Sequence, residues 1–394
     1  MENKDLIAFM QKYLQINTSH PKPVYEQAIA LFKAQALQDG FECIDIILPS
    51  GRPVLMVVVR GADPSLPALA LNHHMDVVPA ADPALWKFAP FAGHIENGLI
   101  YGRGTQDMKG VGVVHYGALK RLTEADRQPR RTICLVMVPD EEIGGETGVG
   151  QLVKTKEFKK LNIGYVLDEG LPSSSDETLF IKVSDRKPLQ IRVTSKGSMA
   201  HGSRLRAHNA AHSLIDFLNK VTTFQYEQRV KTEEQPSGLL LSMNVTSLQA
   251  GVFNDGVVAL NIIPDQAHAT LDIRVPPTMS TREAAEMIDE WMKGFQQISY
   301  SIEAVVYEGK QGDTSSLLYR VLESAVGAAG LKAQPYFAEG ASDLRFYLQE
   351  GIEGFGFTPF TIKDNLHGVD EAIALSDLAL GCGLMYQILV DFCL

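Results

Sequence analysis

The chain has 394 residues, of which 45% are hydrophobic and 21% charged, and its formal net charge is −11. This composition is typical of a folded enzyme and excludes wholesale disorder, while the length favours two domains. The negative balance disfavours nucleic acid as a partner. The four cysteines form no CxxC pair, so neither a disulfide framework nor a thiolate metal site is indicated, and a reducing, cytoplasmic location is expected.

The N-terminal segment mixes acidic and basic residues within an amphipathic period, which predicts a first helix and not a signal peptide. No stretch reaches the roughly 18 uncharged apolar residues of a membrane span, because Asp391 interrupts the nearest one. We therefore expect no membrane partner.

Residues 1–187 alternate apolar runs with a helical pattern. Such alternation predicts an α/β fold with a largely parallel sheet flanked by helices. The expected strands lie in residues 53–61, 68–78, 132–142 and 162–170, and a helix is expected over residues 110–125. Polar clusters follow several of these strands, at the edge where open α/β sheets collect their ligands.

From Pro188 the pattern changes to short alternating strands around two helical segments, residues 208–224 and 281–295. This pattern predicts an inserted α+β domain of one sheet and two helices over residues 188–305. Residues 1–187 and 306–394 would then form a discontinuous catalytic domain. Gly330 and Gly351 are predicted to end helices, and Ser376 to cap the last helix.

Two adjacent glutamates, Glu141 and Glu142, end the apolar run ICLVMVPDEE. Neighbouring side chains at a strand end point in different directions, so one carboxylate can ligate a metal while the other handles protons. A bound divalent ion lowers the pKa of its water to about 7, where a nearby carboxylate can accept the proton. The pair therefore predicts metal-dependent hydrolysis of an amide bond.

In LNHHMDVV the alternation of a strand places His74 and Asp76 on one face. His74 is the candidate ligand, and Asp76 is placed to bond the other imidazole nitrogen and fix the tautomer. A buried histidine satisfied by other groups is the alternative.

Three further candidates occur in polar segments: Asp107 in GRGTQDMKG, Glu169 in LDEG and His367 in LHGVDE. Asp107 could equally cap the following helix, and Glu169 and His367 could be solvated loop residues. Several carboxylates packed together without a cation would have raised pKa values and would cost stability, so a shared metal accounts for them best.

The whole chain resembles the aminoacylase family of zinc amidohydrolases, whose relatives include carboxypeptidase G and succinyl-diaminopimelate desuccinylase. The resemblance covers nearly the whole sequence as an ordered set of segments: LNHHMDVVP, YGRGTQDMKG, VPDEEIGG, LDEG, SKGSMAHGSR, NIIP, LDIRV, ASDLR, GFTP and LHGVDE. RGTQDMK and LDEG are more similar to aminoacylases than to the relatives. The resemblance implies a zinc-peptidase-like fold with a lid and dimerisation domain.

The resemblance also implies two metal ions per subunit, expected to be zinc, cobalt or manganese. His74 and Glu169 would bind one ion, Glu142 and His367 the other, and Asp107 would bridge them. Glu141 would be the general base and acid and Asp76 the residue that orients the metal histidine. The Asp107–Met108 peptide bond is expected to be cis.

Four more residues match family positions. His201 would reach the active site of the partner subunit in a homodimer and stabilise the oxyanion, although Gly202 stands where the family commonly has alanine. Asn261 and Arg274 would contact substrate oxygens, and Arg345 would bind the substrate carboxylate or form a structural ion pair.

The function predicted from these residues is hydrolysis of an N-acyl-L-amino acid to a carboxylate and a free amino acid. One alternative is a dipeptidase or carboxypeptidase on the same scaffold. Another is a noncatalytic protein that binds acyl-amino acids, which would have no need of the base Glu141.

Overall fold

The computed structural model describes residues 3–173, 175, 177–206, 208–295, 297–304, 310–361 and 365–394. The chain divides into two compact units. The first unit comprises Met1–Ser184, Gln311–Tyr336 and Ser342–Leu394, and the second comprises Asp185–Lys310 and Phe337–Ala341. The expected boundary at residue 305 falls outside the described residues.

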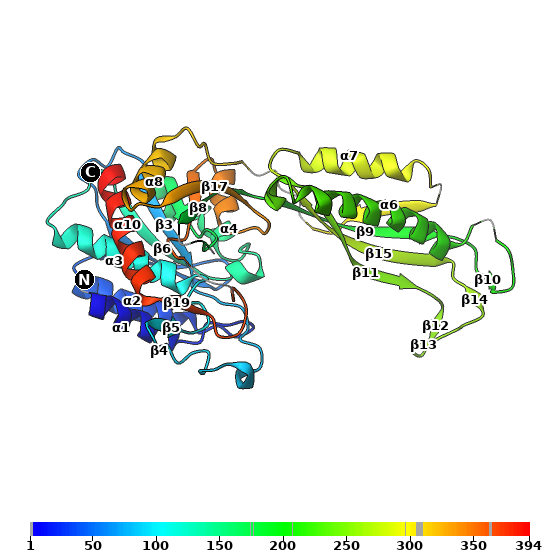
Figure 1. Cartoon of the computed structure of the whole chain (residues 1–394), viewed down its shortest axis with the longest axis horizontal. Helices are drawn as coiled ribbons and strands as arrows, with labels where there is room; N and C mark the ends of the chain where they lie inside the picture. Colours follow the sequence, from blue (N-terminus) through cyan, green and yellow to red (C-terminus); the bar gives the residue numbers. More distant parts are fainter. Residues whose placement is uncertain are drawn as a thin grey trace. The chain divides into compact units, whose positions relative to one another are not determined.

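An eight-stranded sheet forms the centre of the first unit, in the order β1-β2-β6-β3-β7-β18-β8-β17 (Figure 1). The strands are β1 (Glu42–Ile47), β2 (Pro53–Val59), β3 (Ala68–His74), β6 (Ile133–Val138), β7 (Ile163–Asp168), β8 (Thr178–Asp185), β17 (Lys332–Ala338) and β18 (Glu353–Phe357). The four central strands β6, β3, β7 and β18 run parallel to one another, while β1 with β2, β2 with β6, and β18 with β8 pair antiparallel. The expected α/β sheet is confirmed, with antiparallel strands beside its parallel core.

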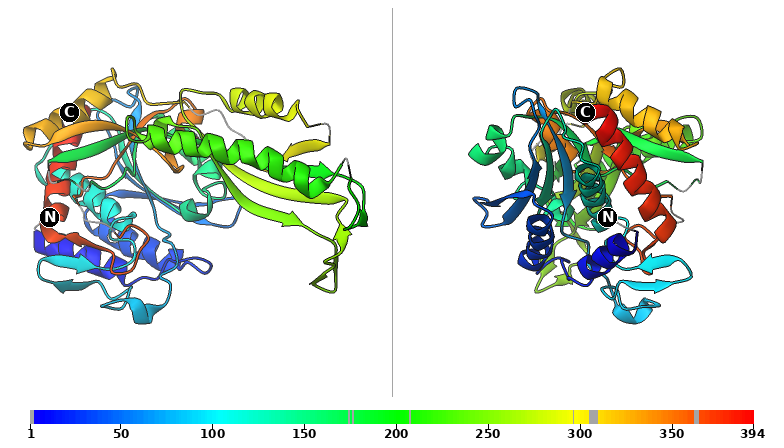
Figure 2. Two further views of the ribbon diagram at one scale, coloured as in Figure 1. Left: turned by 45° about the vertical axis from the view of Figure 1, so that its right-hand side comes forward. Right: turned by 90° about the vertical axis from the view of Figure 1, so that its left-hand side faces the viewer.

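Every residue of β3 and β6 is buried, because helices cover both faces of the sheet. One covering layer contains α1 (Asn3–Leu14), α2 (Tyr25–Gln38), α3 (Lys109–Glu124) and α10 (Leu375–Cys393), with α8 (Leu317–Ala328) packed on α10 (Figure 2). Aromatic rings join the helices of this layer, since the Phe32 ring centroid lies 4.8 Å from Phe9 and 5.8 Å from Tyr116.

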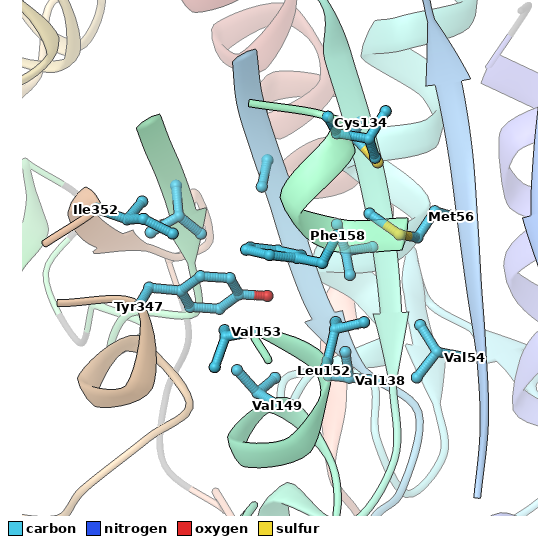
Figure 3. Packing of buried hydrophobic residues seen from close by; sticks show 14 of the residues in the cluster. Val54, Met56, Cys134, Val138, Val149, Leu152, Val153, Phe158, Tyr347 and Ile352 are labelled. Carbon is cyan, nitrogen blue, oxygen red and sulfur yellow. The ribbon is translucent and has the colours of Figure 1, made fainter. Parts of the chain in front are cut away.

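The other face packs against α4 (Val149–Leu152), α5 (Lys156–Lys160) and α9 (Leu344–Gln349). Figure 3 shows Val54, Met56 and Val138 from the strands facing Leu152 and Phe158. Burial of such side chains stabilises the fold by about 1.5 to 3 kcal/mol each and fixes the strands whose ends carry the polar clusters.

The last helix, α10, differs from one expectation. It begins at Leu375, and its N-cap residue is Ala374 without a side-chain capping bond, so the predicted cap at Ser376 is wrong. Among the described residues α10 alone is long and apolar enough to cross a membrane by length and composition, and 50% of its most apolar window is buried inside the structure.

The second unit contains a four-stranded antiparallel sheet in the order β11-β15-β9-β16. Its strands are β9 (Lys187–Lys196), β11 (Ser242–Ala250), β15 (Gln266–Val275) and β16 (Ile298–Ile302). Buried residues alternate along β9 and β15, so one face of the sheet packs on α6 (Ala210–Lys231) and α7 (Thr281–Met292) (Figure 1). Two short ladders complete the unit: β10 (Ala200–His201) with β14 (Ile262–Ile263), and β12 (Phe253–Asn254) with β13 (Val257–Val258).

Helix α3 packs closely against β3 at Gly112. A Cβ atom built on Gly112 would lie 2.4 Å from the ring of the buried His73, next to the candidate ligand His74. We expect Gly112→Ala to destabilise the protein by about 1 to 3 kcal/mol, as overpacking of a core does. In α8, Gly327 has nothing within 4 Å of the same built atom, so Gly327→Ala should stabilise by up to about 1 kcal/mol. The free energy of unfolding of both variants, measured by denaturant titration, checks these two predictions. An equal change in both variants would contradict the close packing at Gly112.

Candidate metal centre

The ends of three parallel strands bring one histidine and three glutamates to one edge of the large sheet. His74 is the last residue of β3, Glu141 and Glu142 begin a short 3-10 turn after β6, and Glu169 directly follows β7. Because the carboxyl ends of neighbouring parallel strands lie at the same edge, these side chains converge.

A small sheet brings Asp107 and His367 to the same edge. It contains β4 (His94–Glu96), β5 (Leu99–Tyr101) and β19 (Ala372–Ala374), and the pairing of β19 with β5 places the loop before Asp107 beside the segment after His367. Two buried residues fasten these loops. Glu371 accepts hydrogen bonds from the backbone of Gln106 at 2.8 Å and from Arg103 at 2.6 Å, and Arg103 donates to the carbonyl of His367 at 3.1 Å.

Asp107 lies between two histidines. Its Oδ1 is 2.9 Å from His74 Nε2, and its Oδ2 is 3.0 Å from His367 Nε2. Each histidine also has a second carboxylate: Glu169 Oε2 lies 3.5 Å from His74 Nε2, and Glu142 Oε2 lies 3.6 Å from His367 Nε2. The structure thus brings all five predicted ligands together around the carboxylate of Asp107.

The sequence left two roles open for Asp107, that of a metal ligand and that of a cap for the following helix. The N-cap of α3 is Met108, with no side-chain capping bond, so the reading of Asp107 as a helix cap is wrong. The Asp107–Met108 peptide bond is cis. The carboxylate of Asp107 faces His74 and His367 and makes no bond to the start of the helix.

Charge in this cluster is poorly compensated by the protein alone. Burial, followed by the nearby charge of Asp107, raises the pKa of Glu142 to about 8 and that of Glu169 to about 7. Burial and the charge of Glu169 also raise the pKa of Glu141. A hydrogen bond with Asp107 raises the pKa of His367 to about 8 despite partial burial. The carboxylates thus resist ionisation while His367 favours its cationic form, and both shifts indicate a site built for a cation.

The donor set fits divalent metal ions. One ligand atom from each of His74, Asp107 and Glu142 lies within 4.8 Å of the others, and the same holds for His74, Glu141 and Glu169. Imidazole nitrogens with carboxylate oxygens suit zinc and related divalent ions, which polarise carbonyl groups and lower the pKa of bound water.

Binding of a metal ion should therefore release protons from these side chains, and its affinity should depend on pH. With pKa values of about 8 for Glu142 and His367 and about 7 for Glu169, these groups are wholly or partly protonated at neutral pH in the metal-free protein, and only their deprotonated forms bind a cation. We expect zinc affinity to rise as pH increases from about 6 to about 9, with proton release, and then to level off. Calorimetric titration of chelator-stripped protein in two buffers of different ionisation enthalpy measures both quantities. Affinity that stays constant over this range would contradict the raised pKa values.

Asp76 contacts more of the site than the sequence predicted. His74 Nδ1 lies 3.0 Å from the backbone carbonyl oxygen of Asp76 and 3.7 Å from its carboxylate, so the carbonyl, and not the expected carboxylate, is the nearer partner. The carboxylate instead accepts hydrogen bonds from the backbone N–H groups of Glu141 at 3.2 Å and Glu142 at 2.9 Å. Asp76 therefore orients the glutamate turn as well as the histidine.

Asp140 supports that turn from the other side. Its backbone is left-handed, with φ of 65°, a conformation that costs energy for a residue with a side chain. Three side chains bind the buried carboxylate: Tyr25 at 2.8 Å, Arg52 at 2.8 Å and Thr147 at 2.8 Å. These bonds hold the chain in the conformation that turns Glu141 and Glu142 out of the sheet.

Arg345 is buried, and its guanidinium donates to the carbonyl groups of Ser342 and Gly144, with Glu146 at 3.6 Å. It therefore braces the loop after the glutamate turn. Binding of a substrate carboxylate by Arg345 stays a prediction.

The remaining predicted residues lie in the second unit. His201 and Asn261 are exposed neighbours, since β10 pairs with β14 and the N–H of Gly202 donates to the carbonyl of Asn261 at 2.6 Å. Arg274 lies near the opposite end of β15 and binds Asp272 through two bonds of 2.9 and 3.1 Å. The structure therefore groups His201 with Asn261 and not with Arg274.

Comparison with known proteins places the chain in a family. A model described as Peptidase family M20/M25/M40 matches residues 70–391. The chain belongs to this family. It is 31% identical to Aminoacylase-1 of Dictyostelium discoideum, with 98% of this chain and 97% of the relative covered, and 32% identical to Aminoacylase-1 of Sus scrofa, with 97% and 94% covered. The resemblance to aminoacylases is thereby confirmed.

Solved structures agree on the fold. An M20 family metallo-carboxypeptidase from Sulfolobus solfataricus is 18% identical with a TM-score of 0.74, and 99% of each chain is covered. A Bacillus subtilis protein described as a dinuclear metal binding peptidase from this family is 15% identical with a TM-score of 0.71, covering 99% of this chain and 98% of that one. These likenesses confirm the expected fold class.

Sequence patterns do not reveal the residues that support the candidate ligands, among them His20, Tyr25, Arg52, Arg103 and Glu371. Each bonds to a residue at least 56 positions away in the sequence. No local spacing rule connects such partners, although the buried charges of Arg103 and Glu371 required a partner somewhere.

Proposed function

We propose that this protein hydrolyses N-acyl-L-amino acids to a carboxylate and a free L-amino acid, using two zinc ions per subunit. The observation that supports this most directly is Asp107, whose two carboxylate oxygens face His74 and His367 at 2.9 and 3.0 Å. A carboxylate in this position suits two adjacent cations, each with a histidine and a glutamate of its own. Cobalt or manganese would suit the same oxygen-rich donors.

Glu141 is the proposed proton carrier. Its carboxylate belongs to the same ligand-atom cluster as His74 and Glu169, and its pKa is raised by burial and neighbouring negative charge. When bound, the metal ions would supply a Lewis acid and favour deprotonation of the attacking water. Glu141 takes a proton from that water as its oxygen attacks the acyl carbon. It then returns the proton to the amine nitrogen as the C–N bond breaks, so that one water is consumed for each bond cleaved.

The second unit is the proposed lid and dimerisation domain, in which His201 would stabilise the oxyanion of the partner subunit's substrate. Asn261 and Arg274 would bind substrate oxygens, and Arg345 the substrate carboxylate. Several large apolar side chains of this unit are exposed, which is typical of an interaction surface. They are Met199, Leu205, Leu248, Phe253, Val257 and Leu260. A homodimer would cover part of this surface.

All four cysteines are free thiols, which supports a reducing, cytoplasmic location for the protein. A small-molecule substrate, with neither nucleic acid nor a membrane as partner, completes the proposal.

A panel of substrates tests the reaction. Zinc-loaded protein should release amine from N-acetyl-L-amino acids at least about 10-fold faster, in kcat/KM, than from dipeptides of the same C-terminal residue. Chelation should abolish turnover and added zinc should restore it. Faster cleavage of dipeptides would favour the peptidase alternative, and binding of acyl-amino acids without metal-dependent turnover would favour a noncatalytic protein.

A further inference from the structure

The segment between α1 and α2 lies against the metal centre and is held firmly. Lys109, at the start of α3, donates from Nζ to the carbonyl groups of Tyr13 at 3.2 Å and Ile16 at 2.7 Å. Asn17 closes a local turn by accepting from the backbone N–H of Ser19 at 2.9 Å. These bonds fix residues 13–19 relative to the helix that follows Asp107.

The same segment is bonded to the extension of β3. The N–H of His20 donates to the carbonyl of Val77 at 3.3 Å, and the N–H of Val77 donates to the carbonyl of Thr18 at 3.2 Å. His20 is therefore anchored through its own backbone to the residue that follows Asp76.

From this position the side chain of His20 reaches Asp76. Its Nε2 lies 3.0 Å from Asp76 Oδ2, and the imidazole is only 11% exposed while the Asp76 carboxylate is fully buried. A carboxylate oxygen accepts hydrogen bonds, so Nε2 of His20 is the natural donor of this pair.

Asp76 in turn bonds to residues of the candidate metal centre. Its two carboxylate oxygens also accept the N–H groups of Glu141 and Glu142, and its carbonyl oxygen lies 3.0 Å from His74 Nδ1. Among the described residues, the side chains next to the Asp76 carboxylate are those of His20 at 3.0 Å and His74 at 3.7 Å. Rotation of the carboxylate would therefore disturb the proposed base Glu141 and the proposed ligand Glu142 together.

We infer that His20 is a positioning residue, which holds the Asp76 carboxylate toward the Glu141–Glu142 turn and thereby sets the metal affinity of the centre and the turnover of the proposed reaction. The part that concerns turnover rests on the proposed function, whereas the part that concerns metal affinity does not.

Two substitutions separate the hydrogen bond from simple packing. His20→Leu keeps a side chain of similar bulk but cannot donate, and His20→Gln keeps an N–H donor at the end of a side chain of similar reach. His212, an exposed histidine on α6, provides the matched control as His212→Leu. Zinc dissociation constants come from calorimetric titration of stripped protein, and kcat and KM come from hydrolysis of N-acetyl-L-methionine by the zinc-loaded protein.

We expect His20→Leu to weaken zinc binding by about 10-fold or more, the usual loss when a partner behind a metal ligand is removed. Its kcat should fall while KM stays within about twofold, and His20→Gln should recover most of both losses. Unchanged zinc affinity in His20→Leu, or a His20→Gln variant as weak as His20→Leu, would overturn the inference. If the wild-type protein failed to hydrolyse acyl-amino acids, the proposed function would fail and the zinc titrations would still decide the role of His20.

Discussion

Replacement of Glu141 by glutamine should lower kcat by at least about 100-fold while the protein keeps its full complement of metal. The amide has nearly the same shape as the carboxylate but cannot accept the proton of the attacking water, and general base catalysis contributes about 100-fold to 10,000-fold. The ligand set around Asp107 does not depend on the charge of Glu141, because the contacts of Asp107 are made to His74 and His367.

Turnover measured together with metal content per subunit checks this prediction. Glu157→Gln serves as the control, since Glu157 is an exposed glutamate on α5. A Glu141→Gln protein that contains the metal of the wild type and turns over at a similar rate would remove Glu141 from the mechanism. Loss of metal in parallel with activity would instead make Glu141 a ligand.

Replacement of His201 by alanine should reduce kcat by about 100-fold to 1,000-fold with little change in metal content. These factors correspond to roughly 2.7 to 4 kcal/mol, the loss expected when a single donor to a developing oxyanion is removed. His201 is exposed in the second unit and its Nδ1 bonds only Ser203 among the contacts described, at 2.9 Å, so its loss should not unfold the unit. His208→Ala, at another exposed histidine of the same loop, is the matched control.

Mixing the two inactive proteins tests whether sites are shared between subunits. A heterodimer of Glu141→Gln and His201→Ala subunits contains one site in which both residues are intact if His201 acts on the partner subunit. We expect partial recovery of activity after subunit exchange. Exchange verified by mass spectrometry without any recovery would mean that His201 does not act across the interface.

The sequence predicted that four of these side chains converge, because each of the four lies at a position with a simple local rule. His74 and Glu169 end or follow apolar strands, and Glu141 and Glu142 follow a third. Parallel strands place their carboxyl ends together whatever their order in the sheet, so these four residues could be grouped before the order was known. His367 needed the resemblance, because a lone histidine in a polar loop has no such rule.

The bonds that orient these ligands could not be predicted in the same way. The Asp76 carboxylate was expected to bond the imidazole of His74, but it accepts from the turn of Glu141 and Glu142, which is 65 residues away. The choice between the carboxylate and the carbonyl of Asp76 depends on the exact path of the backbone after β3. The absence of a cap at Ser376 has the same origin, because β19 continues directly into α10 and leaves no separate capping residue.

Anomalous scattering from a crystal of the zinc-loaded protein measures directly whether Asp107 bridges two metal ions. We expect two zinc peaks per subunit, each about 2.0 to 2.2 Å from one oxygen of Asp107, with His74 and Glu169 on one ion and Glu142 and His367 on the other. A single peak, or two peaks of which Asp107 contacts one or none, would contradict it.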